Sequence, residues 1–208
     1  MIDNIIKGIQ KGSIDYLLED VINDGKKDII KIANDTLYQI TSTFNQNNKN
    51  YENISSIKFG QCENILKDIY NIPRNETLII FKTEKYIEGL LIPLINYDIF
   101  NPITKGKLDF NYCKNLYVDI IIPVSIEEKN LFKYDPNNSY YNDNCHTYTT
   151  INNTDITLYD RKNEFNNLNL FLCENNCTYN GYDLKNKKSL CQCPIKDRII
   201  FNQKINKT

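Results

Sequence analysis

The chain has 208 residues and a mass of 24.4 kDa, the size of one domain with at most a small appendage. Its 25 basic and 26 acidic side chains leave a net charge of −1, so no long-range field attracts nucleic acid or anionic lipid and we expect neither as a partner. A hydrophobic fraction of 41%, with 15 tyrosines and 9 phenylalanines, excludes an intrinsically disordered chain.

The first 28 residues are expected to form an extension of the domain, because they mix helical and irregular patterns. Residues 1–10 carry Asp3 and Lys7 and lack a long apolar core, so they do not have the form of a signal peptide. The longest apolar run, near Ile120 to Val124, is much shorter than the roughly 20 residues of a membrane helix. We therefore expect a piece of a larger exported protein, whose membrane attachment would come from segments outside this chain.

A hairpin, a loop and a helix are predicted next along the chain. Alternating apolar and polar residues over 28–41 indicate two strands, joined by an Asn34-Asp35 turn that can accept a positive φ. The polar stretch 45–52 is expected to be a loop. Apolar residues at helical spacing predict a helix over 61–70, which Pro73 prevents from continuing. Its apolar face would carry Cys62, Ile65, Leu66 and Ile69.

The remaining chain is predicted to consist mainly of strands. Turn signals separate β-forming runs at 78–82, 90–100, 108–113, 117–124 and 168–173, and a strand pair is expected over 147–158. A capping box at Ser125–Glu128 indicates a short helical turn, residues 134–144 a loop and residues 160–165 a short helix. The predicted fold is mainly β, an antiparallel sandwich or an α+β domain, with one or two short helices and a disulfide-stapled C-terminal hairpin. Its limits would be an extension over 1–28, a β-rich core over 29–172, a Cys-rich hairpin over 173–196 and a flexible tail over 197–208.

The spacing of the cysteines predicts disulfides and an oxidising compartment. Four of them form a C-x3-C-x13-C-x-C cluster at Cys173, Cys177, Cys191 and Cys193. Cys191 and Cys193 are expected to face opposite sides of an extended segment and to bond to different partners, which favours disulfides over a zinc site. A bridge from Cys177 to Cys191, for example, would close a loop of about 15 residues and contribute roughly 3 kcal/mol.

The pairing of the cysteines cannot be deduced from the sequence, and their odd number leaves one thiol over. We expect three internal disulfides, with Cys145 among the bonded cysteines, and a leftover thiol that can pair outside this chain. The disulfide candidates are Cys62, Cys113, Cys145, Cys173, Cys177, Cys191 and Cys193.

Seven N-x-[ST] sequons support an exported location, although an Asn-rich chain also produces some sequons by chance. Their asparagines are expected in loops or on solvent-facing positions, because attached glycans need water. The N-glycosylation candidates are Asn34, Asn53, Asn75, Asn137, Asn152, Asn176 and Asn206.

No catalytic or metal site is predicted. The only histidine, His146, directly follows Cys145, and neighbouring side chains of an extended chain diverge, which argues against a Cys/His pair. The glycines form no phosphate-binding motif, and a calcium-like stretch at 135–139 has Tyr140 where the sharp turn needs glycine. Carboxylate pairs such as Glu127-Glu128 are typical of solvated surfaces. We therefore expect no cofactor and no metal.

Four tyrosines are candidates for an interface, because tyrosine offers a large amphipathic contact area at low entropic cost. They are Tyr134, Tyr140, Tyr141 and Tyr148. The alternative is that their rings cover a sheet edge in a chain whose coding bias favours tyrosine. Arg161 offers a similar choice between a buried structural partner of Asp155 and a binding residue.

The ordered cysteine-bearing segments resemble a known kind of extracellular region. They run from Phe59-Gly-Gln-Cys62 through Lys107-Leu-Asp-Phe-Asn-Tyr-Cys113 and Tyr141-Asn-Asp-Asn-Cys145 to Cys191-Gln-Cys193. This string is similar to cysteine-rich extracellular regions of large membrane proteins from unicellular eukaryotes with AT-rich genomes, which typically precede membrane-spanning segments. The resemblance covers about residues 30–196 and implies an ectodomain or a released extracellular piece; it carries over no catalytic residue.

Three functions are compatible with these patterns. The preferred one is an extracellular cell-surface module for adhesion, recognition or surface structure, without an enzymatic centre, whose partners are other surface proteins, glycans or copies of itself. The second is a subunit of an extracellular filament or coat, assembled by strand addition or by an intermolecular disulfide. The third is an enzyme or enzyme inhibitor, which a pocket gathering Arg161, His146 and a carboxylate would favour.

Overall fold

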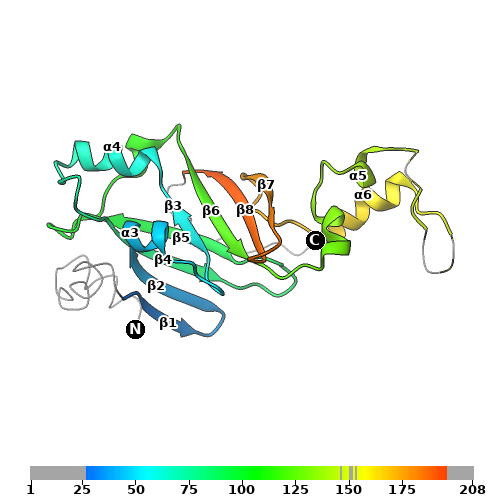
Figure 1. Cartoon of the computed structure of the whole chain (residues 1–208), viewed down its shortest axis with the longest axis horizontal. Helices are drawn as coiled ribbons and strands as arrows, with labels where there is room; N and C mark the ends of the chain where they lie inside the picture. The colour runs from blue at the N-terminus through cyan, green and yellow to red at the C-terminus, as the bar shows by residue number, and fades with distance from the viewer. Residues whose placement is uncertain (1–26, 146, 150–151, 153, 196–208) are drawn as a thin grey trace.

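The computed structural model describes residues 27–145, 147–149, 152 and 154–195 (Figure 1). The predicted extension, the predicted flexible tail, His146 and Asn206 lie outside the described residues, apart from positions 27 and 28 of the extension.

Two four-stranded antiparallel sheets form the body of the described chain. The first has the order β1-β2-β4-β5, with β1 at Ile29–Ala33, β2 at Thr36–Ser42, β4 at Ile79–Lys85 and β5 at Leu94–Phe100. The second has the order β3-β6-β8-β7, with β3 at Ser56–Lys58, β6 at Tyr117–Pro123, β7 at Thr178–Asp183 and β8 at Lys188–Pro194. The mainly β, antiparallel fold predicted from the sequence is confirmed.

Alternating residues of both sheets build one hydrophobic core. Ile80 and Ile99 are cross-strand partners in the first sheet, as are Ile57 and Ile120 in the second, and all four are buried in the same cluster. Burying each such aliphatic side chain contributes about 1.5–3 kcal/mol. The alternation of strand side chains therefore fixes which residues face the core.

The predicted N-terminal hairpin and the helix predicted over 61–70 are both confirmed. β1 and β2 pair with Ala33 opposite Thr36, and Asn34 adopts a positive φ of 54° in the turn between them. The helix α4 spans Gln61–Ile69 and buries Cys62 and Leu66. Ile69, however, is 42% exposed, so the apolar face is narrower than predicted.

Residues 45–52 are not a simple loop. Helix α3 occupies Thr43–Asn48, and the side chain of Ser42 caps it by accepting a hydrogen bond from the Asn45 backbone N–H. Asn45 and Gln46 are buried, and the Gln46 side-chain oxygen accepts from the backbone N–H of Ile57. Polar side chains hold this segment against the sheet, which hydrophobic periodicity could not indicate.

Two strands predicted from β-forming residues are absent. Residues 110–113 form the 3-10 helix η1, Phe110–Cys113, which begins where the Asp109 carboxylate accepts from the backbone N–H of Asn111. Residues 168–173 begin with a turn at the end of a helix. Asn169 has a φ of 50° in this turn, which is incompatible with an extended strand. Local turn chemistry outweighs β propensity at both places.

The segment 125–170 is more helical than predicted. It contains η2 at Glu128–Tyr134, α5 at Ser139–Asn142 and α6 at Leu158–Asn167. The capping box at Ser125 does not start η2, whose N-cap is Glu127 and makes no side-chain cap bond. Among the described residues of 147–158, the predicted strand pair is reduced to an isolated bridge between Thr149 and Asp155. Figure 1 shows α5 and α6 beyond the end of the two sheets.

Three disulfides join six of the seven cysteines: Cys62–Cys113, Cys173–Cys191 and Cys177–Cys193. The bridge considered between Cys177 and Cys191 is therefore wrong. Cys191 and Cys193 do bond to different partners, but both point into the core, with the exposed Gln192 between them. The expectation of opposite faces is wrong because strand side chains alternate with a period of two, so residues two apart share a face. The predicted C-terminal hairpin is confirmed, as β7 and β8.

Candidate functional site

The four candidate interface tyrosines come together inside a small core of their own. Tyr140 and Tyr141 are buried with Phe165 and Leu170, and the half-buried Tyr134 and Tyr148 pack against them. The rings of Tyr140 and Tyr141 meet edge-on, with centroids 4.8 Å apart. The interface interpretation fails for these two residues, and so does the sheet-edge alternative, because their rings fill the interior between α5 and α6.

Arg161 is buried, as the structural alternative requires, but its pairing with Asp155 stays a prediction. Its side chain is 1% exposed, donates to the main-chain carbonyl of Asp143 at 2.9 Å and lies over the Tyr140 ring at 5.3 Å. The guanidinium therefore joins α6 to the chain that follows α5.

Cys145 is not disulfide-bonded, contrary to prediction. It lies on the surface as a free thiol, and its backbone N–H donates to the Asp143 carboxylate at 2.8 Å. The six other cysteines form disulfides with one another within the two-sheet body. Cys145 instead lies between α5 and α6, beyond the sheets. The leftover thiol expected from the odd cysteine count is thus Cys145.

Six of the seven sequon asparagines lie among the described residues, and all six are exposed. Asn34 is in the β1–β2 turn, Asn53 precedes β3, and Asn75 follows α4. Asn137, Asn152 and Asn176 lie in the connections around the helical segment and before β7. These positions suit glycan attachment, which stays a prediction.

A buried ion pair in the first sheet is the arrangement closest to a catalytic one. Lys82 Nζ lies 2.8 Å from the Glu84 carboxylate and 3.1 Å from Ser55 Oγ, and burial lowers the pKa of Lys82. A serine–lysine hydrolytic pair would need a similar contact. Ser55 and Lys82 are 0% exposed, however, and Glu84 accepts from both the hydroxyl and the backbone N–H of Ser55. No substrate can reach this hydroxyl in the folded chain, so the cluster is structural.

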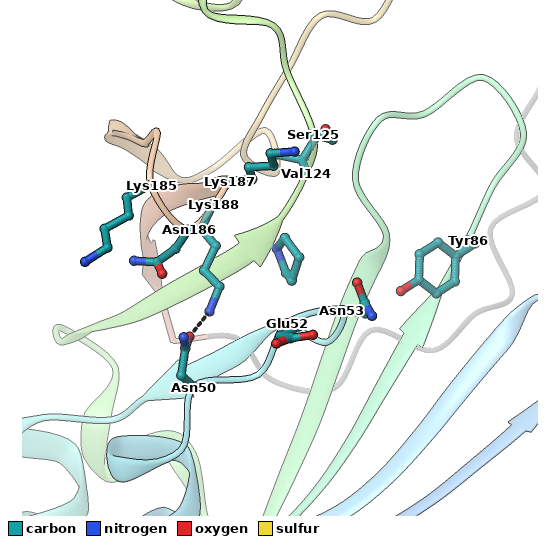
Figure 2. Close-up of a pocket in the computed structure, with 11 residues that line it drawn as sticks. Asn50, Glu52, Asn53, Tyr86, Val124, Ser125, Lys185, Asn186, Lys187 and Lys188 are labelled. Carbon is teal, nitrogen blue, oxygen red and sulfur yellow. Dashed lines mark hydrogen bonds between the residues drawn. The ribbon is translucent and has the colours of Figure 1, made fainter.

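A basic hollow lies where the ends of the two sheets meet, and it has a volume of about 500 Å³ (Figure 2). Three chain segments and one tyrosine form it: the loop before β3, the end of β6, the β7–β8 turn and Tyr86 after β4. Figure 2 shows Lys188 and Asn50 on one side and Tyr86 on the other, with Glu52 and Asn53 between them. Its lining residues are Asn50, Glu52, Asn53, Tyr86, Pro123, Val124, Ser125, Lys185, Asn186, Lys187 and Lys188.

The turn that carries the lysines is fixed by its own hydrogen bonds. The Asp183 carboxylate accepts from the backbone and side-chain N–H groups of Asn186, and these bonds lower the pKa of Asp183. The backbone carbonyl of Lys187 accepts from Val124 at 3.0 Å, which ties the turn to the end of β6. The lysines are therefore presented on a constrained turn.

The lining of the basic hollow has a formal charge of +2, from three lysines and one glutamate, on a chain whose net charge is −1. Lys188 is only 7% exposed, and its ammonium donates to the side-chain oxygen of Asn50. Lys187 and Ser125 remain exposed to solvent. Such a lining, with ammonium, hydroxyl and amide groups and the edge of a phenol, can bind an anionic group that also carries hydroxyls.

An apolar hollow of about 470 Å³ adjoins the basic one, and the two share Asn53 and Tyr86. Ile30 and Ile32 lie on the same face of the first sheet as the buried Lys82 and Glu84, yet they are 41% and 73% exposed. Leu37, Ile54 and the rim residues Asn34, Asp35 and Thr36 complete the lining.

Sequence reasoning missed both hollows. The run Lys185-Asn-Lys-Lys188 is a readable basic cluster on a hairpin turn, and it could have drawn attention. Asn50 and Asn53 belong to a chain that is rich in asparagine throughout, so their residue type alone does not mark a binding site. Tyr86 has no local signal, because only the pairing of β2 with β4 brings it beside Asn34 and Asn53.

Within the described part of the chain, no group of three His, Cys, Asp or Glu side chains could hold a metal ion. No helix among those residues has the length and apolar character to cross a membrane. Comparison of the chain with protein-family models, with curated proteins and with solved structures gives no match.

Proposed function

We propose that this chain is an extracellular module of a cell surface and that it recognises acidic sugars through the basic hollow, without catalysis. Three internal disulfides support the location, because such bonds persist in oxidising compartments and are rare in reducing ones. Six exposed sequon asparagines agree with passage through a secretory pathway. The resemblance to cysteine-rich ectodomains that precede membrane-spanning segments points the same way.

The observation that carries the recognition role is the composition of the basic hollow. Lysine ammonium groups suit a carboxylate or sulfate, and the Asn50 amide and Ser125 hydroxyl suit sugar hydroxyls. The half-exposed Tyr86 ring offers a flat apolar surface beside them. A nucleic acid is not the expected anion, because the charge around the hollow is local and the whole chain is slightly acidic.

The location is tested by the state of the cysteines in the natural protein and by its accessibility. An antibody against the folded chain is expected to label intact source cells, and non-reducing peptide mapping of the protein isolated from them should recover the three disulfides. Free thiols at all seven cysteines would overturn the proposal. Unfolding by a metal chelator would instead indicate the zinc alternative.

The recognition role is tested on an array of sialylated, sulfated and uronic acid oligosaccharides, each printed beside its neutral counterpart. The wild-type chain is expected to bind acidic members, and Lys187→Gln should weaken that binding by about tenfold through loss of one charge-assisted contact. Lys129→Gln is the matched control, because Lys129 is 78% exposed and lies outside the hollow. Equal binding of acidic and neutral members, no binding at all, or the same loss in both variants would each contradict the proposal.

Assembly into a filament or coat is the second candidate function, and the free thiol of Cys145 on the surface is the observation that favours it. If the chain assembles through this thiol, oxidised protein will run as a covalent dimer on non-reducing gels, and Cys145→Ser will abolish the dimer. A chain that stays monomeric at high concentration in both forms would exclude this function.

A further inference from the structure

The apolar hollow beside β1 has two candidate glycosylation sites on its rim. Of the six described sequon asparagines, two line it: Asn34 from the β1–β2 turn and Asn53 from the loop before β3. They come from segments 19 positions apart in the chain and meet at one exposed apolar surface. Asn75, Asn152 and Asn176 line neither this hollow nor the basic one.

The floor of the hollow is a surface that water solvates poorly. Ile32 is 73% exposed, Ile30 is 41% exposed and Tyr86 is 47% exposed, and they adjoin one another around Leu37. Covering these side chains would remove apolar surface from water, which is favourable. In addition, β1 pairs only with β2 among the described strands, so its other edge offers unpaired backbone groups.

We infer that N-linked glycans on Asn34 and Asn53 fold over this hollow and cover the apolar inner face of β1. The inference rests on the proposed extracellular location, because it needs the secretory pathway that attaches such glycans. One face of the first N-acetylglucosamine ring presents C–H groups, and its acetamide ends in a methyl group. These surfaces can pack on Ile30 and Ile32, which line this hollow and not the basic one, while the sugar hydroxyls remain in water.

The attachment itself is ordinary group transfer. The side-chain nitrogen of each asparagine forms a bond to the anomeric carbon of an oligosaccharide, the bond from that carbon to a lipid diphosphate carrier breaks, and the diphosphate leaves as the amide loses one proton to solvent. The carrier-linked oligosaccharide is the co-reactant. Transfer acts on the unfolded chain, so the burial of Thr36 and Ser55, the hydroxyl residues of the two sequons, does not prevent it.

The test compares the full chain made in two hosts. A eukaryotic secretory host supplies glycans, and a bacterial periplasm supplies disulfides without glycans. The double variant Asn34→Asp/Asn53→Gln removes both acceptors, and Asp retains a tolerance for the positive φ at position 34. Asn75→Gln is the control, because it removes an exposed acceptor away from the hollow.

In the secreted protein, the double variant is expected to raise the fluorescence of the apolar dye ANS at least about twofold and to lower Tm by about 3 °C, because the hollow loses its cover. Neither quantity should change with Asn75→Gln. In the periplasmic protein, which has no glycans to lose, the double variant should change neither dye binding nor Tm.

The results that overturn the inference are distinct from those that overturn the proposed function. Glycopeptide mapping of the natural protein that finds no sugar at any sequon contradicts the exported location and the inference together. Sugars at Asn75 but not at Asn34 or Asn53, or sugars at both rim positions whose loss leaves ANS binding and Tm unchanged, overturn only the inference. A glycosylated dimer that Ile32→Lys dissociates would assign the hollow to a second copy of the chain.

Discussion

Lys82 and Glu84 point from alternate positions of β4 to the same side of the first sheet, where both side chains are fully buried. The ammonium also donates to the backbone carbonyl and the hydroxyl of Ser55, and the hydroxyl of Tyr86 donates to Glu84 at 3.2 Å. The two charges are thus desolvated together and compensate each other. A change to either one leaves the other buried without its counter-charge.

Replacement of Lys82 by methionine is expected to lower the free energy of unfolding by about 3–5 kcal/mol, because the Glu84 carboxylate then stays buried without a cation. Urea denaturation followed by circular dichroism measures the change. The double variant Lys82→Met/Glu84→Gln should recover a large part of the loss, because the neutral amide can still accept from Ser55.

A surface pair provides the control for this prediction. Lys129 and Glu127 are 78% and 67% exposed, so Lys129→Met should change stability by less than about 1 kcal/mol. If Lys82→Met is as mild as Lys129→Met, the buried pair does not stabilise the sheet as argued.

At the scale of elements, the disulfides differ in what they join. Cys62–Cys113 ties α4 to η1 and closes a loop with a sequence separation of 51. Cys177–Cys193 lies within the C-terminal hairpin and has a separation of 16. The first bond therefore constrains the unfolded chain more than the second does.

Removal of the Cys62–Cys113 bond by alanine substitution of both residues is expected to lower stability by about 4 kcal/mol, and removal of Cys177–Cys193 by about 3 kcal/mol, from loop closure alone. The Cys62 pair should lose more still, because both side chains are buried in the core and alanine leaves space there. Paired urea melts measure the difference. An equal or reversed order would mean that strain or residual structure outweighs chain entropy.

Element prediction succeeded where pattern and turn chemistry agree. The hairpin around Asn34-Asp35 and the helix α4 follow directly from alternation, helical spacing and Pro73. Helix α3 was missed because its buried side chains are polar and their partners are distant in sequence: Asp28 accepts from Asn45, and Gln46 accepts from Ile57. Pairings of that kind exist only in the folded chain.

At the scale of the whole molecule, the sequence indicated the number of disulfides and the antiparallel sheets, but not which surfaces stay open. Both hollows are lined by residues from segments far apart in the chain, which only tertiary packing brings together, so no local pattern indicates them. The tyrosine-rich segment shows the same limit. Composition indicated these residues as a group, but only tertiary packing decides that Tyr140 is buried and Tyr148 only partly buried.

Tyrosine burial in both parts of the molecule has a consequence at alkaline pH. Burial raises the pKa of Tyr86 to about 12, helped by the neighbouring Glu84 carboxylate. Burial also raises the pKa of Tyr51, Tyr140 and Tyr141 well above 10, and the first two in addition donate to the carboxylates of Asp28 and Glu164. In the unfolded chain these phenols ionise near the ordinary value of 10.0.

The folded chain therefore binds more protons than the unfolded chain above pH 10, so the free energy of unfolding falls as the pH rises. This stabilisation is fully present below pH 10 and is lost as the pH passes from about 10 toward 12 and beyond. Urea melts at a series of alkaline pH values should show the decline, and Tyr86→Phe should make it shallower. Tyr159→Phe, at a position 74% exposed, is the matched control and should leave the profile unchanged. A profile that is flat between pH 10 and 12, or equally altered by both variants, would show that the buried phenols are not the groups responsible.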